Sequence, residues 1–319
     1  MSNKLNQNLS SAGVIMILMA LALGCSRGKS DRAVSVRDSF NHQELSLPQI
    51  PESVEGAEAR AAFVAEHFWD ELDFGEDRRS LDTAFIEQNF VNYLAVLSVT
   101  PKSVAQSAIE RLRVKAKGSP EAADLLDDIA LRYLDDPNSP MRNEELFILF
   151  ARDWSADESL REEKRARANY RLNQAMKNRV GTKGADFAFI DRTGENTTLY
   201  RSFGDGMTLV MFYDPDCEQC KAVKEQLMHS QINDDVKMIA IDTMDDRDKW
   251  EEDKGSFPEE WTVGFATDPI EEEEIYVIRA MPTFYLFDKN GIVAMKDPPV
   301  EKVLWQLLKG KIQYENQSP

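Results

Sequence analysis

The chain has little cysteine, with three residues of this type among 319. They are Cys25, Cys217 and Cys220, too few for a small domain held together by several disulfides. Cys217 and Cys220 are the one pair that is close in sequence, with two residues between them. Cysteines at positions i and i+3 can close a disulfide ring or share a metal ion.

Histidine is equally scarce, and the three residues of this type are His42, His67 and His229. Only His229 is near the cysteine pair, nine residues after Cys220. A structural zinc site normally has four protein ligands, and the chain contains no second CxxC. We therefore expect no metal and no cofactor. Metal binding and an inert structural disulfide are the two chemical alternatives to a redox role for the pair.

Acidic residues outnumber basic residues in both halves of the chain, and the net charge is −18. The imbalance is largest in residues 181–319, where 15 Lys and Arg stand against 28 Asp and Glu, a net of −13. Binding to nucleic acid depends on clustered Lys and Arg, so no nucleic-acid partner is expected. A hydrophobic content of 42% and a length of 319 residues predict an ordinary globular protein of two domains.

The apolar segment at the N-terminus is too short to span a bilayer. It extends from Val14 to Leu23, about ten residues, whereas a membrane-spanning helix needs roughly 20. Lys4 lies in the polar start that precedes it. This pattern predicts a signal peptide.

The end of that segment, Leu21–Cys25, resembles the lipobox of bacterial lipoproteins, with Gly24 at the cleavage position. The resemblance implies a signal peptide over residues 1–24 and acyl chains on Cys25. Several acyl chains together anchor a protein stably. The anchor implies a periplasmic or outer-surface location at a bacterial membrane, and Ser26 rather than aspartate after the cysteine favours the periplasmic face of the outer membrane by family analogy. An uncleaved anchor, or an ordinary signal peptide with a chance cysteine, is the alternative.

Helical periodicity fills residues 57–180, after a lipidated tether and polar linker over residues 25–56. Apolar side chains recur at i, i+3, i+4 and i+7, and turns rich in proline and glycine separate the periodic segments. Ser119 and Pro120 predict one helix start, as an N-cap and the first helical position. We predict an all-α domain over residues 57–180, with its aromatic side chains in the core. The helical segments are 61–72, 85–97, 104–114, 122–134, 144–151 and 160–176.

Strand patterns replace the helical period in residues 181–319. The run Val236–Ile241 is apolar enough for a strand buried on both faces, and Asn290 with Gly291 predicts a hairpin turn. One helix follows the CxxC, and another closes the chain over Val300–Leu308. This order predicts an α/β domain with a mixed central sheet flanked by helices. The predicted strands are 187–190, 197–200, 208–213, 236–241, 262–266, 283–288 and 292–295.

The CxxC lies between a predicted strand, Thr208–Tyr213, and a predicted helix that continues from Lys221. Unpaired N–H groups at a helix start favour the thiolate of a cysteine placed there. Cys220 stands one turn further on, in position to attack a mixed disulfide. These residues predict Cys217 as the nucleophile and Cys220 as the resolving thiol.

Met281, Pro282 and Thr283 form a second element of the pattern, directly before the apolar segment Phe284–Phe287. A proline can open a strand because no ladder hydrogen bond is lost there. With the CxxC before it, this element carries a family resemblance. Residues 181–311 resemble the thioredoxin-fold domain of the TlpA/ResA-like group of membrane-tethered bacterial thiol-disulfide oxidoreductases.

The first half of the chain carries a resemblance of its own. Residues 47–180 resemble the helical domain of unassigned function that precedes a thioredoxin-like domain in many bacterial lipoproteins. The matching residues include Phe68–Asp70 and Asp136–Glu145. Together the two resemblances imply a thioredoxin-like fold C-terminal to an all-α helical domain, over residues 181–319 and 57–180.

The resemblance also implies a site. Cys217 and Cys220 would form a redox-active disulfide, and Pro282 would be a cis-proline beside it. Met281, Pro282 and Thr283 would bind an extended substrate. The implied partners are protein thiols and disulfides, the membrane through the lipid on Cys25, and an upstream membrane electron donor. A redox-sensing or partner-binding lipoprotein without turnover is the alternative function.

The sequence departs from the family at positions where acids are common. Met211 stands six residues before Cys217, where many thioredoxins have an acid or asparagine. Val223 stands six residues after it, where ResA-like proteins often have glutamate. If a buried acid assists proton transfer, Glu225 is a candidate.

Three acids instead surround the first cysteine: Asp214, Asp216 and Glu218. Like charges oppose a thiolate, and a less stable reduced form means a lower reduction potential. The sequence therefore predicts a reductase or isomerase rather than a strong oxidant.

Overall fold

The computed structural model describes residues 44–230, 232, 236–305 and 307. The predicted signal peptide, Cys25 and the first part of the tether lie outside the described residues. The chain divides into two compact units, one ending at Asn169 and the other beginning at Tyr170. Each unit is described by itself.

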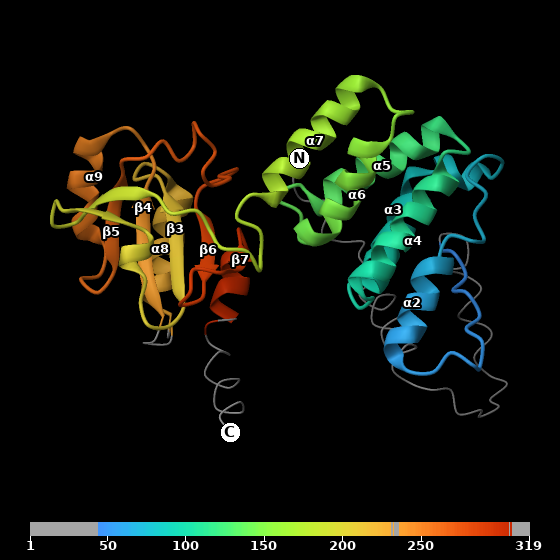
Figure 1. Ribbon diagram of the computed structural model, residues 1–319, viewed down its shortest axis with the longest axis horizontal. Helices are drawn as coiled ribbons and strands as arrows, with labels where there is room; N and C mark the ends of the chain where they lie inside the picture. Colours follow the sequence, from blue (N-terminus) through green and yellow to red (C-terminus); the bar gives the residue numbers. More distant parts are fainter. Residues whose placement is uncertain (1–43, 231, 233–235, 306, 308–319) are drawn as a thin grey trace. The chain divides into compact units, whose positions relative to one another are not determined.

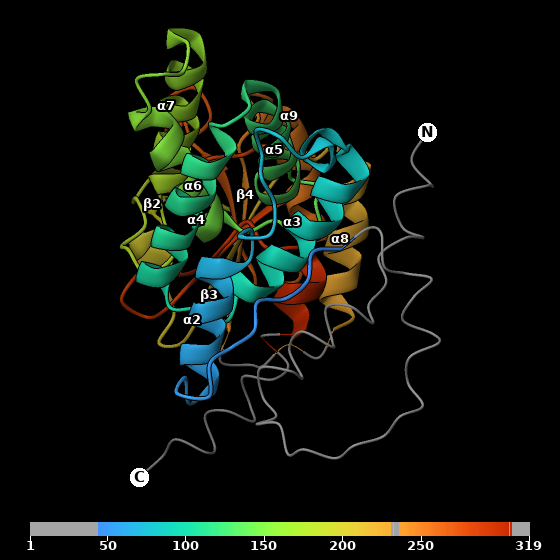
Figure 2. The same ribbon diagram turned by 90° about the vertical axis from the view of Figure 1, so that its right-hand side faces the viewer.

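The first unit is helical, as predicted. Ser119 caps one of its helices, since its hydroxyl accepts a hydrogen bond from the Ala122 N–H at 3.2 Å, and Pro120 is the first helical residue. Helix α2 packs against α3 and α4 (Figure 2), and α5 packs against α3, α4 and α6. The helices are α2 (Ala57–His67), α3 (Thr83–Leu97), α4 (Lys102–Ala116), α5 (Pro120–Leu134), α6 (Glu144–Ala156) and α7 (Glu162–Met176), with a short 3-10 helix, η1 (Arg78–Leu81). Helix α7 continues into the second unit.

The core of the helical unit contains most of the aromatic residues, as expected. Trp69 and Tyr93 are buried with their ring centroids 5.8 Å apart, and Phe90 and Phe150 are buried at the same separation. Phe63 and Tyr133 are the exceptions and are half-buried. Burial of each large aromatic side chain stabilises the unit by about 2–3 kcal/mol.

A buried ionic cluster joins the helices of this unit around Arg113 of α4. Its guanidinium pairs with Asp127 of α5 and, at 2.9 Å, with Asp153 of α6. Asp127 also accepts hydrogen bonds from the Trp154 indole at 2.8 Å and from Lys164 of α7 at 2.9 Å. Burial raises the pKa of Asp127, and the cations beside it act in the opposite direction. These partners compensate for the burial of charged groups.

The second unit contains a mixed sheet, which in the described residues has seven strands in the order β2-β1-β5-β4-β3-β6-β7. Figure 1 shows β5, β4, β3, β6 and β7 side by side in this order. Strands β3, β4 and β5 are parallel, and the other neighbours are antiparallel. The strands are β1 (Ala188–Asp191), β2 (Asn196–Thr198), β3 (Thr208–Tyr213), β4 (Lys237–Asp242), β5 (Thr262–Ala266), β6 (Thr283–Phe287) and β7 (Val293–Lys296). The predicted strands and the hairpin with its turn at Asn290 and Gly291 are confirmed, and a second hairpin joins β1 and β2.

The central strand β3 is buried along its whole length. Its side chains alternate between the two faces of the sheet, as strand geometry requires. Leu209, Met211 and Tyr213 face a core that also contains helix α8 (Glu218–Met228) and the closing helix, described over residues 300–305 and 307. Val210 and Phe212 face a second core with the segment from Ile270 to Tyr276.

One helix, α9 (Arg247–Asp253), was not predicted. It lies between β4 and β5 and begins where the Asp246 carboxylate accepts a hydrogen bond from the Lys249 N–H at 3.2 Å. Its one buried residue, Trp250, packs on Phe265 of β5 with ring centroids 5.8 Å apart. In the chain, α9 and β5 follow β4 and precede β6; in the sheet, β5 lies on the other side of β4 from β3. The short 3-10 helices η2 (Tyr200–Ser202) and η3 (Lys254–Ser256) complete the unit.

Candidate active site

Cys217 stands at the junction of β3 and α8, as predicted. After β3 the chain turns, with the Cys217 N–H donating to the Asp214 carbonyl at 3.1 Å. Cys217 is the N-cap of α8, and its Sγ accepts a hydrogen bond from the Cys220 N–H at 3.1 Å. The sulfur therefore takes the place of the hydroxyl or carboxylate that usually caps a helix.

The two cysteines differ in exposure, and both are free thiols. Cys217 is half-buried, whereas Cys220 is 2% exposed. Burial, together with the hydrogen bond to Cys217 and nearby negative charge, raises the pKa of the Cys220 thiol to about 12, although a backbone hydrogen bond at Asp214 acts in the opposite direction. Cys220 is consequently a neutral thiol near pH 7, and only Cys217 is accessible from solvent.

The predicted second element lies beside the first cysteine. Strands β3 and β6 pair so that Phe212 stands opposite Thr283, which brings the start of β6 to the CxxC end of β3. The Met281–Pro282 peptide bond is cis. The Cys217 Sγ donates to the Met281 carbonyl oxygen at 3.7 Å.

The three residues of this element are not equally accessible. Met281 and Pro282 are half-buried, whereas Thr283 is fully buried. The Thr283 hydroxyl donates to the Ala280 carbonyl at 2.8 Å. Met281 and Pro282 are therefore the residues of this element that a substrate can meet.

Two of the three acids around Cys217 have a lysine partner. Asp216 forms an ion pair with Lys249 of α9, and Glu218 forms one with Lys221 at 2.8 Å. Asp214 has no Lys or Arg partner in the described part of the chain, and its carboxylate accepts a hydrogen bond from the Asp216 N–H at 2.8 Å. The excess of negative charge at the CxxC is therefore smaller than the sequence implies.

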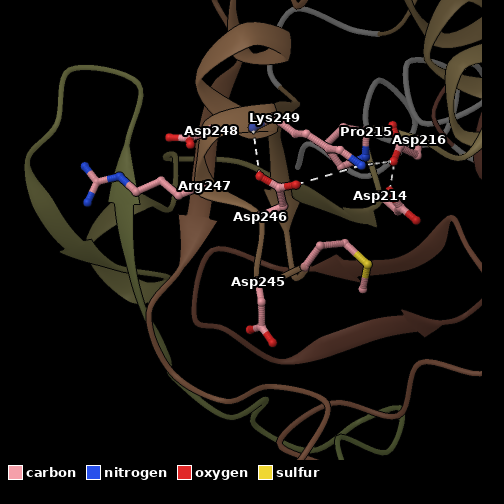
Figure 3. Close-up of a pocket in the computed structure, with 9 residues that line it drawn as sticks. Asp214, Pro215, Asp216, Asp245, Asp246, Arg247, Asp248 and Lys249 are labelled. Atoms are coloured by element: carbon pink, nitrogen blue, oxygen red, sulfur yellow. Dashed lines mark hydrogen bonds and ion pairs between the residues drawn. The ribbon is translucent and has the colours of Figure 1, made fainter.

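A pocket of about 620 Å³ lies against the turn that precedes Cys217. In Figure 3 the Lys249 side chain extends between Asp216 and Asp246, while Arg247 points away from them. The lining residues are Asp214, Pro215, Asp216, Met244, Asp245, Asp246, Arg247, Asp248 and Lys249. Five of these nine are aspartates, so the surface beside the CxxC is acidic.

The structure also tests the positions at which an acid was considered near the thiols. Met211, where many thioredoxins have an acid or asparagine, is buried and shares a core with Cys220. The Glu225 side chain is 61% exposed, and its position on α8 gives it no access to that core. Sequence reasoning missed Asp242, the last residue of β4, which is fully buried. The signal available in the sequence was a carboxylate directly after the apolar run Val236–Ile241.

Two further findings concern the described residues as a whole. They contain no grouping of three or more His, Cys, Asp or Glu side chains that could hold a metal ion. Among them there is also no helix with both the length and the apolar character needed to cross a membrane.

The fold and the site define the class: a thioredoxin-like domain preceded by a helical domain. Family models agree, with a thioredoxin-like domain matched over residues 187–297 and a domain of unknown function (DUF5106) over residues 22–178. A thioredoxin-like protein from Bacteroides caccae, known from its crystal structure, is 31% identical. The similarity covers 82% of this chain and 97% of that one, with a TM-score of 0.75. The chain therefore belongs to this family of thioredoxin-like proteins with an N-terminal DUF5106 domain.

Other solved structures match the second half alone. The C-terminal domain of an uncharacterized protein from Bacteroides fragilis is 33% identical over 41% of this chain and 98% of that one, with a TM-score of 0.39. The thioredoxin domain of a thiol-disulfide oxidoreductase from Bacteroides vulgatus is 16% identical over 41% of this chain and 96% of that one, with a TM-score of 0.34. None of the curated proteins matches this chain.

Proposed function

We propose that the protein is a membrane-anchored, extracytoplasmic thiol-disulfide oxidoreductase that reduces or isomerises disulfides of exported proteins through Cys217 and Cys220. One observation carries the proposal. An accessible thiol caps helix α8 and lies 3.7 Å from the Met281 carbonyl, while its CxxC partner is buried beneath it. This arrangement supplies one thiol for attack and a second for resolution.

The reaction has two exchange steps. The Cys217 thiolate attacks one sulfur of a substrate disulfide, and the other substrate sulfur leaves as a thiolate. Cys220 then attacks the Cys217 sulfur, forms the Cys217–Cys220 disulfide and releases the second substrate thiolate. The substrate gains two electrons and the protein loses two. An electron donor, a protein dithiol at the membrane, reverses the change in the enzyme.

The backbone beside Cys217 supports a role in substrate binding. The Met281 carbonyl accepts a hydrogen bond from the Cys217 thiol. A thiolate has no proton to donate, so this carbonyl becomes available to an N–H group of an extended substrate when Cys217 ionises. Pro282 presents no N–H of its own, and the Thr283 side chain is buried, so the Met281 carbonyl is the group of this element best placed to pair with a substrate backbone.

The direction of the reaction follows from the burial of Cys220. Burial is the largest cause of its raised pKa; a backbone hydrogen bond at Asp214 lowers that pKa, and the charge of Asp214 raises it by a smaller effect. Destabilised thiolates lower the reduction potential of a dithiol. The site therefore favours donating electrons to a substrate disulfide, as a reductase or isomerase does.

The location is part of the proposal. It depends on the signal-peptide pattern of residues 1–24 and on the lipobox resemblance that ends at Cys25. A lipid on Cys25 would hold the CxxC at the periplasmic face of the outer membrane, where substrate disulfides persist. Labelling of cells with radioactive palmitate tests the anchor: wild type should be labelled and Cys25→Ala should not.

Insulin reduction in the presence of dithiothreitol tests the activity. The wild-type chain should reduce insulin, and Cys217→Ser should lose more than about 99% of the rate because the nucleophile is gone. Cys220→Ser should instead accumulate mixed disulfides in cells, and their identification would name the substrates. Absence of turnover in the wild type, with partners still captured by the helical domain, would favour the redox-sensing or partner-binding alternative.

A further inference from the structure

Resolution of a mixed disulfide requires a base for Cys220. Its thiol is 2% exposed and has a pKa of about 12, so bulk water does not remove the proton readily. The thiolate, not the thiol, is the species that attacks a disulfide. A proton acceptor within the core beneath the CxxC would remove this barrier.

Asp242 lies on the correct face of the sheet. Met238 and Ala240 of β4 face the core that contains Cys220, whereas Ile239 and Ile241 face the opposite core. Alternation along the strand therefore directs the Asp242 side chain to the Cys220 side. Asp242 is the last residue of β4, and it lies at the same end of the sheet where β3 leads into the CxxC.

The carboxylate of Asp242 is buried and incompletely paired. It is 0% exposed, and one oxygen accepts a hydrogen bond from the Met244 N–H at 2.8 Å. The other oxygen, Oδ2, has no hydrogen-bond partner among the described residues. A buried carboxylate with a free oxygen is costly to keep ionised, and it gains by accepting a proton.

Tyr213 connects this carboxylate to the cysteine. It is the register partner of Asp242 across the parallel pair β3 and β4, and it shares a core with Cys220. Its buried hydroxyl also has no partner within the described part of the chain. The pKa of Tyr213 is raised by burial and then by the charges of Asp242, Asp253 and Cys220, so the tyrosine lies within electrostatic range of both groups.

The charged groups around Asp242 do not neutralise it. Burial, with smaller contributions from the charges of Asp214, Asp253 and Asp246, raises its pKa to about 7, although the hydrogen bond from the Met244 N–H acts in the opposite direction. The buried cation nearest to Cys220 in sequence is Lys224 on α8, which donates to Ser256 at 2.6 Å and pairs with Asp253 at 3.5 Å.

Two further cations lie near this part of the unit: Lys254, which pairs with Glu251 and donates to the Arg192 carbonyl at 3.3 Å, and Arg192 itself, whose buried Nε has no hydrogen-bond partner in the described residues. The Arg192 guanidinium donates to the Pro258 carbonyl at 2.9 Å and, more weakly, to the Phe257 carbonyl at 3.4 Å. Asp242 is thus a buried acid that changes protonation near neutral pH, with no cation bound to it in the described residues.

We propose that Asp242 is the proton acceptor for the Cys220 thiol during resolution of the mixed disulfide, an assignment that rests on the function proposed above. The Cys220 proton moves to the Asp242 carboxylate as the bond between Cys217 and Cys220 forms. The bond between Cys217 and the substrate sulfur breaks, and its electron pair leaves on the substrate thiolate. The Asp242 carboxylic acid then returns the proton to that thiolate.

The test uses the full chain with Cys25→Ser, so that only the CxxC thiols react, and the aromatic disulfide dithiobis(nitrobenzoate) as the probe. Attack by Cys217 releases one coloured thiolate at a rate that depends on probe concentration. Resolution by Cys220 releases a second one at a rate that does not. Rapid mixing separates the two phases, and the second is measured from about pH 5.5 to about pH 9 in wild type and Asp242→Asn.

The wild-type rate of the second phase should level off above about pH 7.5, where the Asp242 carboxylate is ionised. Asp242→Asn should be at least tenfold slower at pH 7.5, and its rate should rise about tenfold per pH unit because hydroxide must replace the carboxylate. The first phase should change less than twofold. Asp288→Asn, the same substitution at the opposite end of the sheet, should retain the wild-type profile.

Equal profiles for wild type and Asp242→Asn would overturn the assignment and leave the proposed function intact. If Asp242→Asn does not fold, the wild type alone decides, since a rate that climbs tenfold per pH unit up to about pH 9 also overturns it. A wild type that never releases the second thiolate would contradict the proposed function and the role of Asp242 together.

Discussion

The thiol of Cys217 donates a hydrogen bond to the carbonyl oxygen of Met281, a residue 64 positions further along the chain. The register of β3 and β6 sets this relationship, because Phe212 pairs with Thr283 at the end where both the CxxC and the cis-proline lie. The nucleophile and the backbone beside it are therefore fixed by the most buried strands of the sheet. Precise placement of this kind is what a two-step exchange reaction requires.

Alkylation of the reduced protein should separate the two thiols. At pH 7.5 iodoacetamide should modify Cys217 at least about a hundredfold faster than Cys220, because Cys220 is buried and its pKa is about 12. Mass spectrometry of peptides after timed quenching measures both rates. Cys220 should remain slow in Cys217→Ser, and comparable labelling of the two cysteines would refute the asymmetry.

The stability of the second unit should fall as pH rises through the range set by Asp242. Its pKa is about 7 in the folded protein against 3.8 for an ordinary aspartate, so the folded state binds the proton more tightly. Stability is therefore lost between about pH 4 and about pH 7 and stays lower above it. Asp242→Asn should remove this slope.

Urea unfolding at several pH values measures the effect of Asp242. At pH 8 the Asp242→Asn variant should be more stable than wild type by about 2 kcal/mol, allowing for solvent screening and a new amide group to satisfy. At pH 4.5 the difference should be small. The prediction is contradicted if the stability of Asp242→Asn minus that of wild type is lower at pH 8 than at pH 4.5.

Gly264 of β5 should not tolerate a side chain. A Cβ atom there would lie 2.3 Å from the Phe189 ring and 3.0 Å from Ile241. Gly264→Ala should lower the free energy of unfolding by about 1–3 kcal/mol through overpacking. Gly255→Ala is the matched control, since nothing lies within 4 Å of a Cβ there, and its cost should be below about 0.5 kcal/mol. Equal costs would refute the packing argument.

The helical unit offers a second matched pair, on helix α4. Arg113→Met should destabilise the unit by about 3–5 kcal/mol, because it leaves Asp127 buried without its guanidinium partner. Arg111→Met breaks an exposed ion pair with Asp70 and should cost less than about 1 kcal/mol. Circular dichroism during urea unfolding distinguishes the two, and a small effect at Arg113 would contradict the role of the buried cluster.

Much of the fold could be predicted because its signals are local. The strand before Cys217, the helix after it and the turn at Gly291 each follow from a few adjacent residues. Helix α9 escaped prediction because it has only seven residues, most of them charged, and is stabilised by the distant contact between Trp250 and Phe265. Contacts of that kind leave little trace in sequence periodicity.

The site was predictable in its chemistry and less so in its electrostatics. The spacing of Cys217 and Cys220 identifies the redox-active thiols. Whether a lysine pairs with Asp216 or Glu218, however, depends on the fold or on side-chain rotamers. Asp242 was missed for the same reason: its burial depends on the pairing of β4 with β3. Glu225 was a candidate on sequence position alone, and its exposure on α8 removes it.

The measurement that tests the central claim most directly is a redox titration of the full chain with Cys25→Ser in dithiothreitol buffers, read by mass spectrometry of trapped thiols. We predict one two-electron transition that involves Cys217 and Cys220, with a midpoint near that of thioredoxin, about −270 mV. A midpoint near about −120 mV, that of a strong oxidant, would contradict the proposed direction. Absence of a reversible disulfide between the two cysteines would contradict the account itself.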